Sequence, residues 1–334
     1  MKARNLTAIS WAAAMLLLLV SCLWLPFSRM ELKGGSNFLQ LAALFILGWA
    51  PCQFIARRLK TDYTRVGSLM RGIAARFALA FQVLIFIWLL IIGAMIFSHL
   101  SVAAGTPLQD SAFAAFDRAL GFDWLGSLAL LNSYPWLSRA VSWVYWSSAL
   151  QLLFVFLLLS ATLDRQRLAE AQAVLSVSTV IVCAVGFAFP AAGAIPFYQP
   201  AAEYLTSFNP LSGMWHYEQF MSLRTASTPI LDFSKPAGVI QFPSLHVVLA
   251  VVTVLGLRGM RVLFWPALGT NVVVVLGTLS EGGHHLADSL AGGLIACCVI
   301  GVFEKAGLLV RDCSGNVAGE EVQNAALPRS LLPL

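Results

Sequence analysis

The sequence predicts an all-α integral membrane protein, a polytopic helical bundle of about eight spans. Hydrophobic residues make up 59% of the 334 positions, charged residues only 11%, and the mean hydropathy is +0.79. Apolar runs of about 20 residues recur along the chain, which is the length that a helix needs to cross the hydrocarbon core of a bilayer. No run alternates apolar and polar residues as membrane barrel strands do. With barrel strands excluded, α-helices are the structure in which every backbone N–H and C=O group can form a hydrogen bond within the membrane.

Eight apolar runs are the predicted spans, and the sixth is short and close to the seventh. They cover residues 7–27, 38–56, 74–99, 139–162, 170–190, 245–259, 262–280 and 284–304. The first run contains LVSC, which resembles a lipoprotein signal with Cys22 as the lipidated residue. The run continues past Cys22 through LWLPF, which favours an uncleaved first span. The six cysteines show neither zinc-type spacing nor a disulfide framework.

Lys and Arg residues mark one side of the membrane. Those near span ends on that side are Lys2, Arg4, Arg57, Arg58, Lys60, Arg65, Arg71, Arg76, Arg165, Arg167, Arg258, Arg261, Lys305 and Arg311. Because short cytoplasmic loops retain Lys and Arg, we expect both termini to be cytoplasmic in the plasma (inner) membrane. These residues flank spans and do not gather on a soluble face, so the bilayer is the expected partner and nucleic acid is not.

Three regions follow from this pattern. Residues 1–70 form a two-span segment with a basic cytoplasmic loop, residues 71–305 a membrane domain, and residues 306–334 a flexible cytoplasmic tail. Two long segments of the domain are predicted on the outward side. The first, 100–138, has apolar residues at helical spacing and is expected to contain a helix at the membrane interface. The second, 190–244, is rich in proline and lacks strong periodicity, which is typical of functional loops.

Two histidines come to the same membrane face from distant parts of the chain. His246 lies one turn inside the sixth span and His284 begins the eighth, and both spans start on the outward side. Asp288 follows His284 at position i+4, so the two side chains share one face of a helix. Burying such ionisable groups in lipid costs about 2.5–3.5 kcal/mol each on insertion scales, which makes them candidates for function.

The chemistry of these residues points to catalysis. A carboxylate at Asp288 can accept the Nδ1–H of His284, which leaves Nε2 available to attack an electrophile. His246 can act as a general acid. Ser244 and the first N–H groups of the sixth span can hold an anion, and Gly282 and Gly283 allow the chain to pass close to a ligand.

Structural and metal-binding roles are the competing interpretations. A lone histidine in an apolar helix, such as His99, is expected to be structural. Metal binding by His246, His284, His285 and Asp288 is an alternative, although we expect no metal and no cofactor. His285 points about 100° around the helix from His284, and we interpret it as a flanking residue of the site.

The residues FPSLH and GGHHLADSLAG carry a family resemblance. They resemble the second and third motifs of the type 2 phosphatidic acid phosphatase superfamily, and FDRALGFDW resembles a bacterial branch that includes relatives of inositol phosphorylceramide synthase. The resemblance implies a six-helix core preceded by two N-terminal helices, and a metal-independent mechanism through a phosphohistidine. It also implies that His284 is the nucleophile, Asp288 orients it, His246 is the general acid and base, and Ser244 contacts phosphate.

The sequence departs from that family at its phosphate-binding cations. The first motif, with its Lys and Arg-Pro, is absent, Thr278 stands where the third motif has Arg, and Leu245 replaces the Gly of the second. A phosphoryl group needs cationic partners, so Arg224 and Lys235 are the candidate replacements. A solvated loop charge is the alternative interpretation of Arg224.

We therefore expect a membrane lipid phosphatase or phosphotransferase with its site on the outer, periplasmic side. Its substrate would be a lipid phosphate or diphosphate, with water or an alcohol as acceptor. An inositol- or sugar-phosphotransferase that uses a lipid alcohol is one alternative. A non-enzymatic transporter with a proton-relaying His-Asp pair is the other, but the ionisable residues lie at span entrances and no internal repeat is visible.

Overall fold

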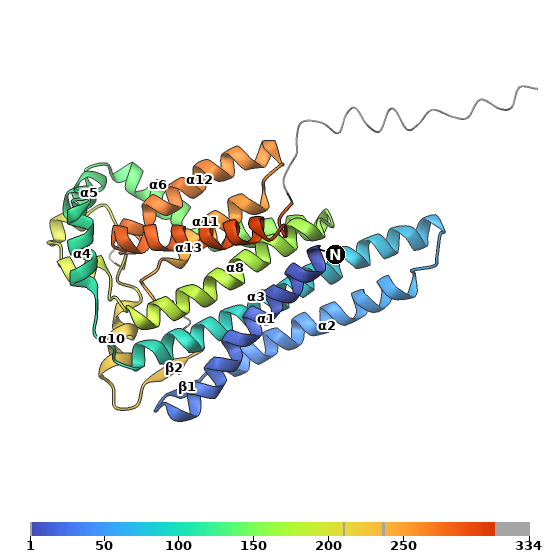
Figure 1. Ribbon diagram of the computed structural model, residues 1–334, viewed down its shortest axis with the longest axis horizontal. Helices are drawn as coiled ribbons and strands as arrows, with labels where there is room; N and C mark the ends of the chain where they lie inside the picture. The colour runs from blue at the N-terminus through green and yellow to red at the C-terminus, as the bar shows by residue number, and fades with distance from the viewer. Residues whose placement is uncertain (1, 210, 236–237, 311–334) are drawn as a thin grey trace, which may run out of the picture.

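The computed structural model describes residues 2–209, 211–235 and 238–310 as a bundle of long helices (Figure 1). Among the described residues, six helices are long and apolar enough to cross a membrane: α1 (Lys2–Trp24, extended by the 3₁₀ turn η1, Leu25–Phe27), α2 (Ser36–Arg58), α3 (Arg65–Ala103), α8 (Arg165–Ala188), α12 (Arg261–Ser280) and α13 (Leu286–Lys305). Helices α6 (Pro135–Trp146) and α7 (Ser148–Ala161) form a further apolar pair that is bent by 44°. The predicted all-α membrane bundle is confirmed.

Helix α11 (Leu245–Gly256) is the short sixth run, and it lies among other helices of the bundle. It packs against α7, α8, α12 and α13. At 1.5 Å per residue its twelve residues rise about 18 Å, little more than half of a hydrocarbon core of about 30 Å. The helix is therefore too short to cross such a core by itself, and His246 lies in its first turn.

The N-terminal helices cover one side of this bundle. Helix α1 packs along α3 and α8, whereas α2 packs on α3 and has no buried residue. A short parallel pair, β1 (Glu31–Lys33) with β2 (Ile230–Asp232), joins the α1–α2 connection to the segment before α11. The predicted division at residue 70 stays a prediction, and residues 311–334 of the predicted tail lie outside the described residues.

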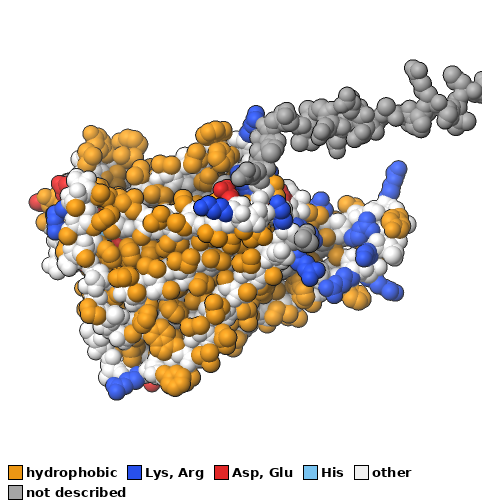
Figure 2. Space-filling model, in the orientation of Figure 1, with side chains coloured by type: hydrophobic (Ala, Val, Ile, Leu, Met, Phe, Trp, Pro, Cys, Tyr) orange, Lys and Arg blue, Asp and Glu red, His pale blue; other side chains and the backbone are white. Residues whose placement is uncertain are grey.

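Short elements cap the end of the bundle opposite the basic loop. They are α4 (Asp110–Ala119), α5 (Trp124–Asn132), α9 (Ala194–Tyr198), the 3₁₀ turn η2 (Ala202–Leu205) and α10 (Tyr217–Thr225). Figure 2 shows Lys and Arg side chains gathered at the end where α2 joins α3, beside a broad hydrophobic face. Figure 1 places α4, α5 and α10 at the other end.

Small residues let the central helices approach one another. Gly292 of α13 faces the backbone of Ser244, the residue that precedes α11, and the Ser244 N–H donates to the Asp288 carbonyl at 3.0 Å. A Cβ at position 292 would overlap the Ser244 carbonyl oxygen. Glycine at this helix interface therefore brings the start of α11 against the first turns of α13.

Replacing Gly292 with Ala is expected to destabilise the protein, because overpacking a tight contact costs about 1–3 kcal/mol. Gly301 on the same helix is the matched control, since a Cβ there meets nothing within 4 Å. Alanine favours a helix over glycine by about 1 kcal/mol, so Gly301→Ala should be neutral or stabilising. Thermal unfolding in detergent measures both midpoints. Equal midpoints would contradict the close approach of α11 and α13.

Candidate functional site

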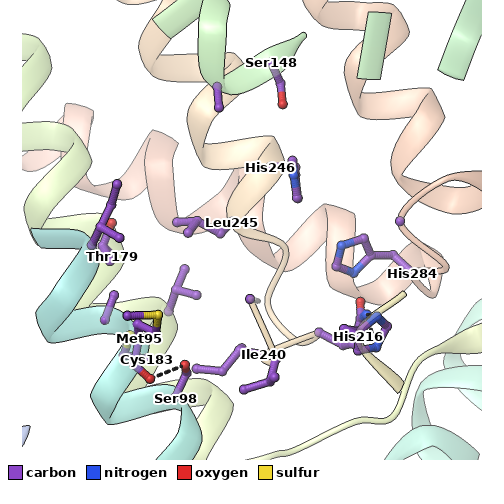
Figure 3. A pocket seen from close by; sticks show the side chains of 18 of the residues that line it. Met95, Ser98, Ser148, Thr179, Cys183, His216, Ile240, Leu245, His246 and His284 are labelled. Atoms are coloured by element: carbon purple, nitrogen blue, oxygen red, sulfur yellow. Dashed lines mark hydrogen bonds between the residues drawn. The ribbon is translucent and has the colours of Figure 1, made fainter. Parts of the chain in front are cut away.

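Three histidines line one cavity of about 390 Å³ (Figure 3). His246 comes from α11, His284 from the turn before α13, and His216 from the residue before α10. The opposite wall is apolar and is formed mainly by α3, α8 and the α6–α7 bend. The cavity therefore joins a polar end with titratable groups to an apolar chamber within the helices.

His284 is held between a carboxylate and a hydroxyl. Its Nδ1 lies 3.1 Å from Asp288 Oδ2, and its Nε2 lies 3.2 Å from the Ser244 hydroxyl. Asp288 is 0% exposed, and the same Oδ2 accepts the backbone N–H of His285 at 3.0 Å. With Nδ1–H donated to the carboxylate, the lone pair of Nε2 points toward Ser244. The predicted contact between His284 and Asp288 is present, but His284 lies in the turn before α13 and not on a face of the helix.

His246 is oriented by a residue that the sequence analysis did not single out. The Tyr145 hydroxyl of α6 lies 3.2 Å from His246 Nδ1, and the two rings are 4.6 Å apart. Tyr145 is buried and lines the same cavity. A hydroxyl can donate or accept, so Tyr145 can support His246 in its neutral and in its protonated state. No sequence signal distinguishes this tyrosine from other aromatic residues of the apolar helix.

His216 was also missed, because it lies in a loop without periodicity. Its ring donates from Nε2 to the Ala192 carbonyl at 3.3 Å, and the Gln241 amide donates to Nδ1 at 3.1 Å. Burial lowers the pKa of His216 to about 4, and burial together with the neighbouring His285 lowers the pKa of His284 to about 3. Both imidazoles are therefore neutral at neutral pH.

His285 points away from the cavity toward α4. Its Nε2 lies 3.3 Å from Asp110 Oδ1, and its Nδ1 lies 3.8 Å from Asp117 Oδ2. Asp110 accepts the N–H groups of residues 192 and 193, and Asp117 those of residues 286 and 287, all at 2.8–2.9 Å. The interpretation of His285 as a flanking residue agrees with this position. The direction of its ring does not arise from helical rotation, because His284 and His285 precede α13 and the backbone of His285 is extended.

Backbone hydrogen bonds from two other segments hold the turn that carries His284. The Gly283 carbonyl accepts the Ala194 N–H at 2.6 Å, and the Glu281 carbonyl accepts the Gly213 N–H at 2.7 Å. Gly213 and Gly283 have φ values of +67° and +64°, and a Cβ on either would lie 2.9 Å from the backbone of the other. Position 283 was expected to approach a ligand, but it approaches other parts of the chain.

Arg224 and Lys235, the two candidate phosphate-binding cations, do not line the histidine cavity. Arg224 donates to the Thr106 carbonyl at 2.9 Å and lies over the Phe220 ring, and burial lowers the pKa of its guanidinium. Lys235 is exposed and follows β2, near Asp232. Among the described residues, no Lys or Arg lines the histidine cavity. Within the same part of the chain, no group of three or more His, Cys, Asp or Glu residues is placed to hold a metal ion.

The comparison with family models decides the family. The model of the PAP2 superfamily matches residues 111–302, which is more than half of the chain. The chain belongs to the PAP2 superfamily. Searches of curated proteins and of solved structures return no match.

Membership of the PAP2 superfamily supports a phosphatase- or phosphotransferase-type function. The matched range includes Tyr145, Ser244, His246, His284 and Asp288, and it runs from α4 into α13. Helices α1, α2 and α3 lie outside it. The residues around the polar end of the cavity are thus mostly within the PAP2 region, while α3 contributes to its apolar wall.

The lowered pKa of His284 can be measured directly. We expect its ring nitrogens to keep the ¹⁵N shifts of a neutral imidazole from pH 7 to about pH 5, whereas an exposed histidine with a pKa of about 6.5 protonates in that range. Because the pKa of His284 is lowered, its imidazole ring stays neutral until the pH falls close to that pKa. The His284→Gln spectrum assigns the signal, and a terminal affinity tag supplies exposed histidines as the reference. Protonation of His284 near pH 6.5 would contradict the effect of burial.

Proposed function

We propose that the protein transfers a phosphoryl group from a lipid phosphate or diphosphate through a phosphohistidine at His284. The observation that carries the proposal is the meeting of His246 and His284 in one cavity, with Asp288 on Nδ1 of His284. The apolar chamber beside them suits a substrate that carries a hydrocarbon chain. Of the functions of the PAP2 superfamily, chemistry on a lipid is the one that this arrangement supports best.

In the first step, the Nε2 lone pair of His284 attacks phosphorus and the bond to the leaving oxygen breaks. His246 donates the proton that the leaving oxygen needs. The Ser244 hydroxyl, now beside Nε2, turns toward a phosphoryl oxygen as the P–N bond forms. Asp288 keeps the Nδ1 proton close and stabilises the positive charge that develops on the imidazole ring.

In the second step, an acceptor hydroxyl attacks phosphorus and the P–N bond breaks. His246 takes the acceptor proton, and His284 returns to the neutral state. Water gives inorganic phosphate, and an alcohol gives a new phosphate ester. The resemblance of FDRALGFDW to a branch that includes relatives of inositol phosphorylceramide synthase favours an alcohol.

The phosphoryl charge needs donors other than the usual cations. Ser244 and the first N–H groups of α11 can supply some of them. Arg224 and Lys235 remain proposed phosphate ligands, but Arg224 would have to leave the Thr106 carbonyl first.

We further propose that the site faces the outer side of the membrane and that both termini are cytoplasmic. The basic residues around the α2–α3 connection support this orientation, because short cytoplasmic loops retain Lys and Arg. The capping helices α4, α5 and α10 lie at the opposite end of the bundle.

Substitutions of His284 and His246 test the nucleophile and the general acid of the proposed reaction separately. With ³²P-labelled lipid phosphates or diphosphates and EDTA, His284→Ala is expected to form no acid-labile phosphoenzyme and to lose at least about 10⁴-fold in turnover. His246→Ala is expected to lose about 10²–10⁴-fold, because general acid–base catalysis is removed. Wild-type chain isolated after a brief reaction should carry the label on residue 284. Label that persists in His284→Ala would refute the phosphohistidine.

Tyr145→Phe tests whether His246 is held by the tyrosine hydroxyl. We expect turnover to fall about 10- to 100-fold, because a small displacement of a reacting group costs that much. The loss should shrink with an activated leaving group such as p-nitrophenol, which needs no proton from His246. Trp146→Phe, beside it on α6, is the matched control for packing. An equal loss with both leaving groups would indicate only a structural role for the hydroxyl.

A further inference from the structure

A second cavity, of about 540 Å³, adjoins the turn that carries His284. Glu281 lines this cavity, and the next residue, Gly282, lines the histidine cavity. Gly282 has no side chain, and a Cβ there would lie 2.6 Å from His284 Cδ2 and 2.8 Å from the Tyr145 hydroxyl oxygen. The two cavities therefore adjoin the same turn, at Glu281 and Gly282, and Gly282 packs closely against His284 and Tyr145.

The second cavity is rich in hydrogen-bonding side chains, unlike the apolar chamber. Its polar lining residues are Arg139, Ser142, Thr206, Ser207, Asn209 and Glu281. They come from α6, from the segment after η2 and from the end of α12. Their donors and acceptors are mixed, with one guanidinium and one carboxylate.

Glu281 supplies a second observation that points to a ligand. The residue is 0% exposed, and its Oε2 accepts the Ser212 hydroxyl at 2.8 Å. Its Oε1 is buried and has no hydrogen-bond partner among the described residues. A buried carboxylate oxygen without a donor is costly, and a ligand hydroxyl in the adjoining cavity would satisfy it.

The wall of the cavity is already ordered. Asn132, at the end of α5, accepts the Ser207 N–H at 2.8 Å through Oδ1, and its carbonyl accepts the Ser207 hydroxyl at 2.8 Å. Its amide donates to the Glu203 carbonyl at 2.8 Å. These bonds hold the segment after η2 against α5, so the cavity does not depend on a ligand to form it.

We propose that this cavity binds the acceptor of the second step, a neutral polyhydroxylated alcohol of the cyclitol or sugar class. A polyol can donate to Glu281 and accept from Arg139 at once, whereas a hydrocarbon chain would leave both groups unpaired. The balanced charge, one cation and one anion, suits a neutral ligand better than a second phosphate. The inference rests on the proposed phosphohistidine and makes the protein a phosphotransferase.

The proposed transfer to the alcohol needs only the phosphoenzyme, the acceptor and His246, and no further reagent. The acceptor O–H gives its proton to His246, its oxygen forms a bond to phosphorus, and the bond between phosphorus and His284 Nε2 breaks. The products are a polyol phosphate and neutral His284. Ordered binding beside Gly282 places the alcohol near phosphorus and lets it compete with the far more concentrated water.

The test measures where the phosphoryl label goes. Phosphoenzyme made from ³²P-labelled lipid phosphate is chased with buffer alone, myo-inositol, glucose, glycerol or butan-1-ol, and the ratio of alcohol phosphate to inorganic phosphate is determined. We expect at least one polyol, but not butan-1-ol, to take most of the label. Ser142→Ala and Asn209→Ala should each lower that ratio about 2- to 10-fold, the worth of one hydrogen bond. Ser133→Ala, an exposed serine outside the cavity, should leave it unchanged.

The yield of phosphoenzyme in the same samples shows whether each variant folds and completes the first step. Saturation-transfer NMR with the same polyols on wild type and His284→Ala measures binding without the chemistry. Label that passes only to water, or a ratio insensitive to both cavity variants, would overturn the acceptor site while leaving the phosphohistidine intact. An absent phosphoenzyme, with polyol binding that Asn209→Ala abolishes, would overturn the proposed function and keep the polyol site.

Discussion

Two buried carboxylates on α4 are the interactions on which the site depends. Asp110 and Asp117 accept four backbone N–H groups, two at residues 192–193 and two in the first turn of α13. The backbone N–H groups of loops and of the first turn of a helix have no partner within their own segment, and burying them unpaired is costly. By satisfying them, α4 allows the turn that carries His284 to sit inside the protein. His285 between the two carboxylates completes this support.

Around this support, each of the three cavity histidines has a contact that orients its ring. Asp288 sets the tautomer of His284, Tyr145 contacts Nδ1 of His246, and Gln241 contacts the His216 ring. Such contacts reduce the reorganisation that a reaction requires, because dipoles are already aimed where charge will develop. Burial contributes as well, since a neutral His284 keeps its Nε2 lone pair available as a nucleophile.

A mainly apolar cavity and a polar cavity adjoin the turn that carries His284. The histidine cavity extends into an apolar chamber, and the second cavity is lined by hydroxyl, amide and charged groups. A two-step transfer through a covalent intermediate needs one place for the donor and one for the acceptor, each open to the same phosphorus atom. The two cavities adjoin this turn at neighbouring residues, Glu281 and Gly282.

The sequence by itself determined the fold class and predicted the contact between His284 and Asp288, which the structure shows. The fold class depends on apolar run length, which can be read from a single chain, whereas the contact joins the turn before α13 to the first turn of that helix. The Lys and Arg pattern predicted that His246 and His284 lie at one membrane face, and the two side chains line one cavity. The tertiary structure decided what depends on long-range packing: Tyr145 beside His246, His216 in the cavity, Glu281 against the second cavity, and Arg224 on a loop carbonyl. Side chains in loops without a period have no sequence signal for direction, so only their packing partners determine where they point.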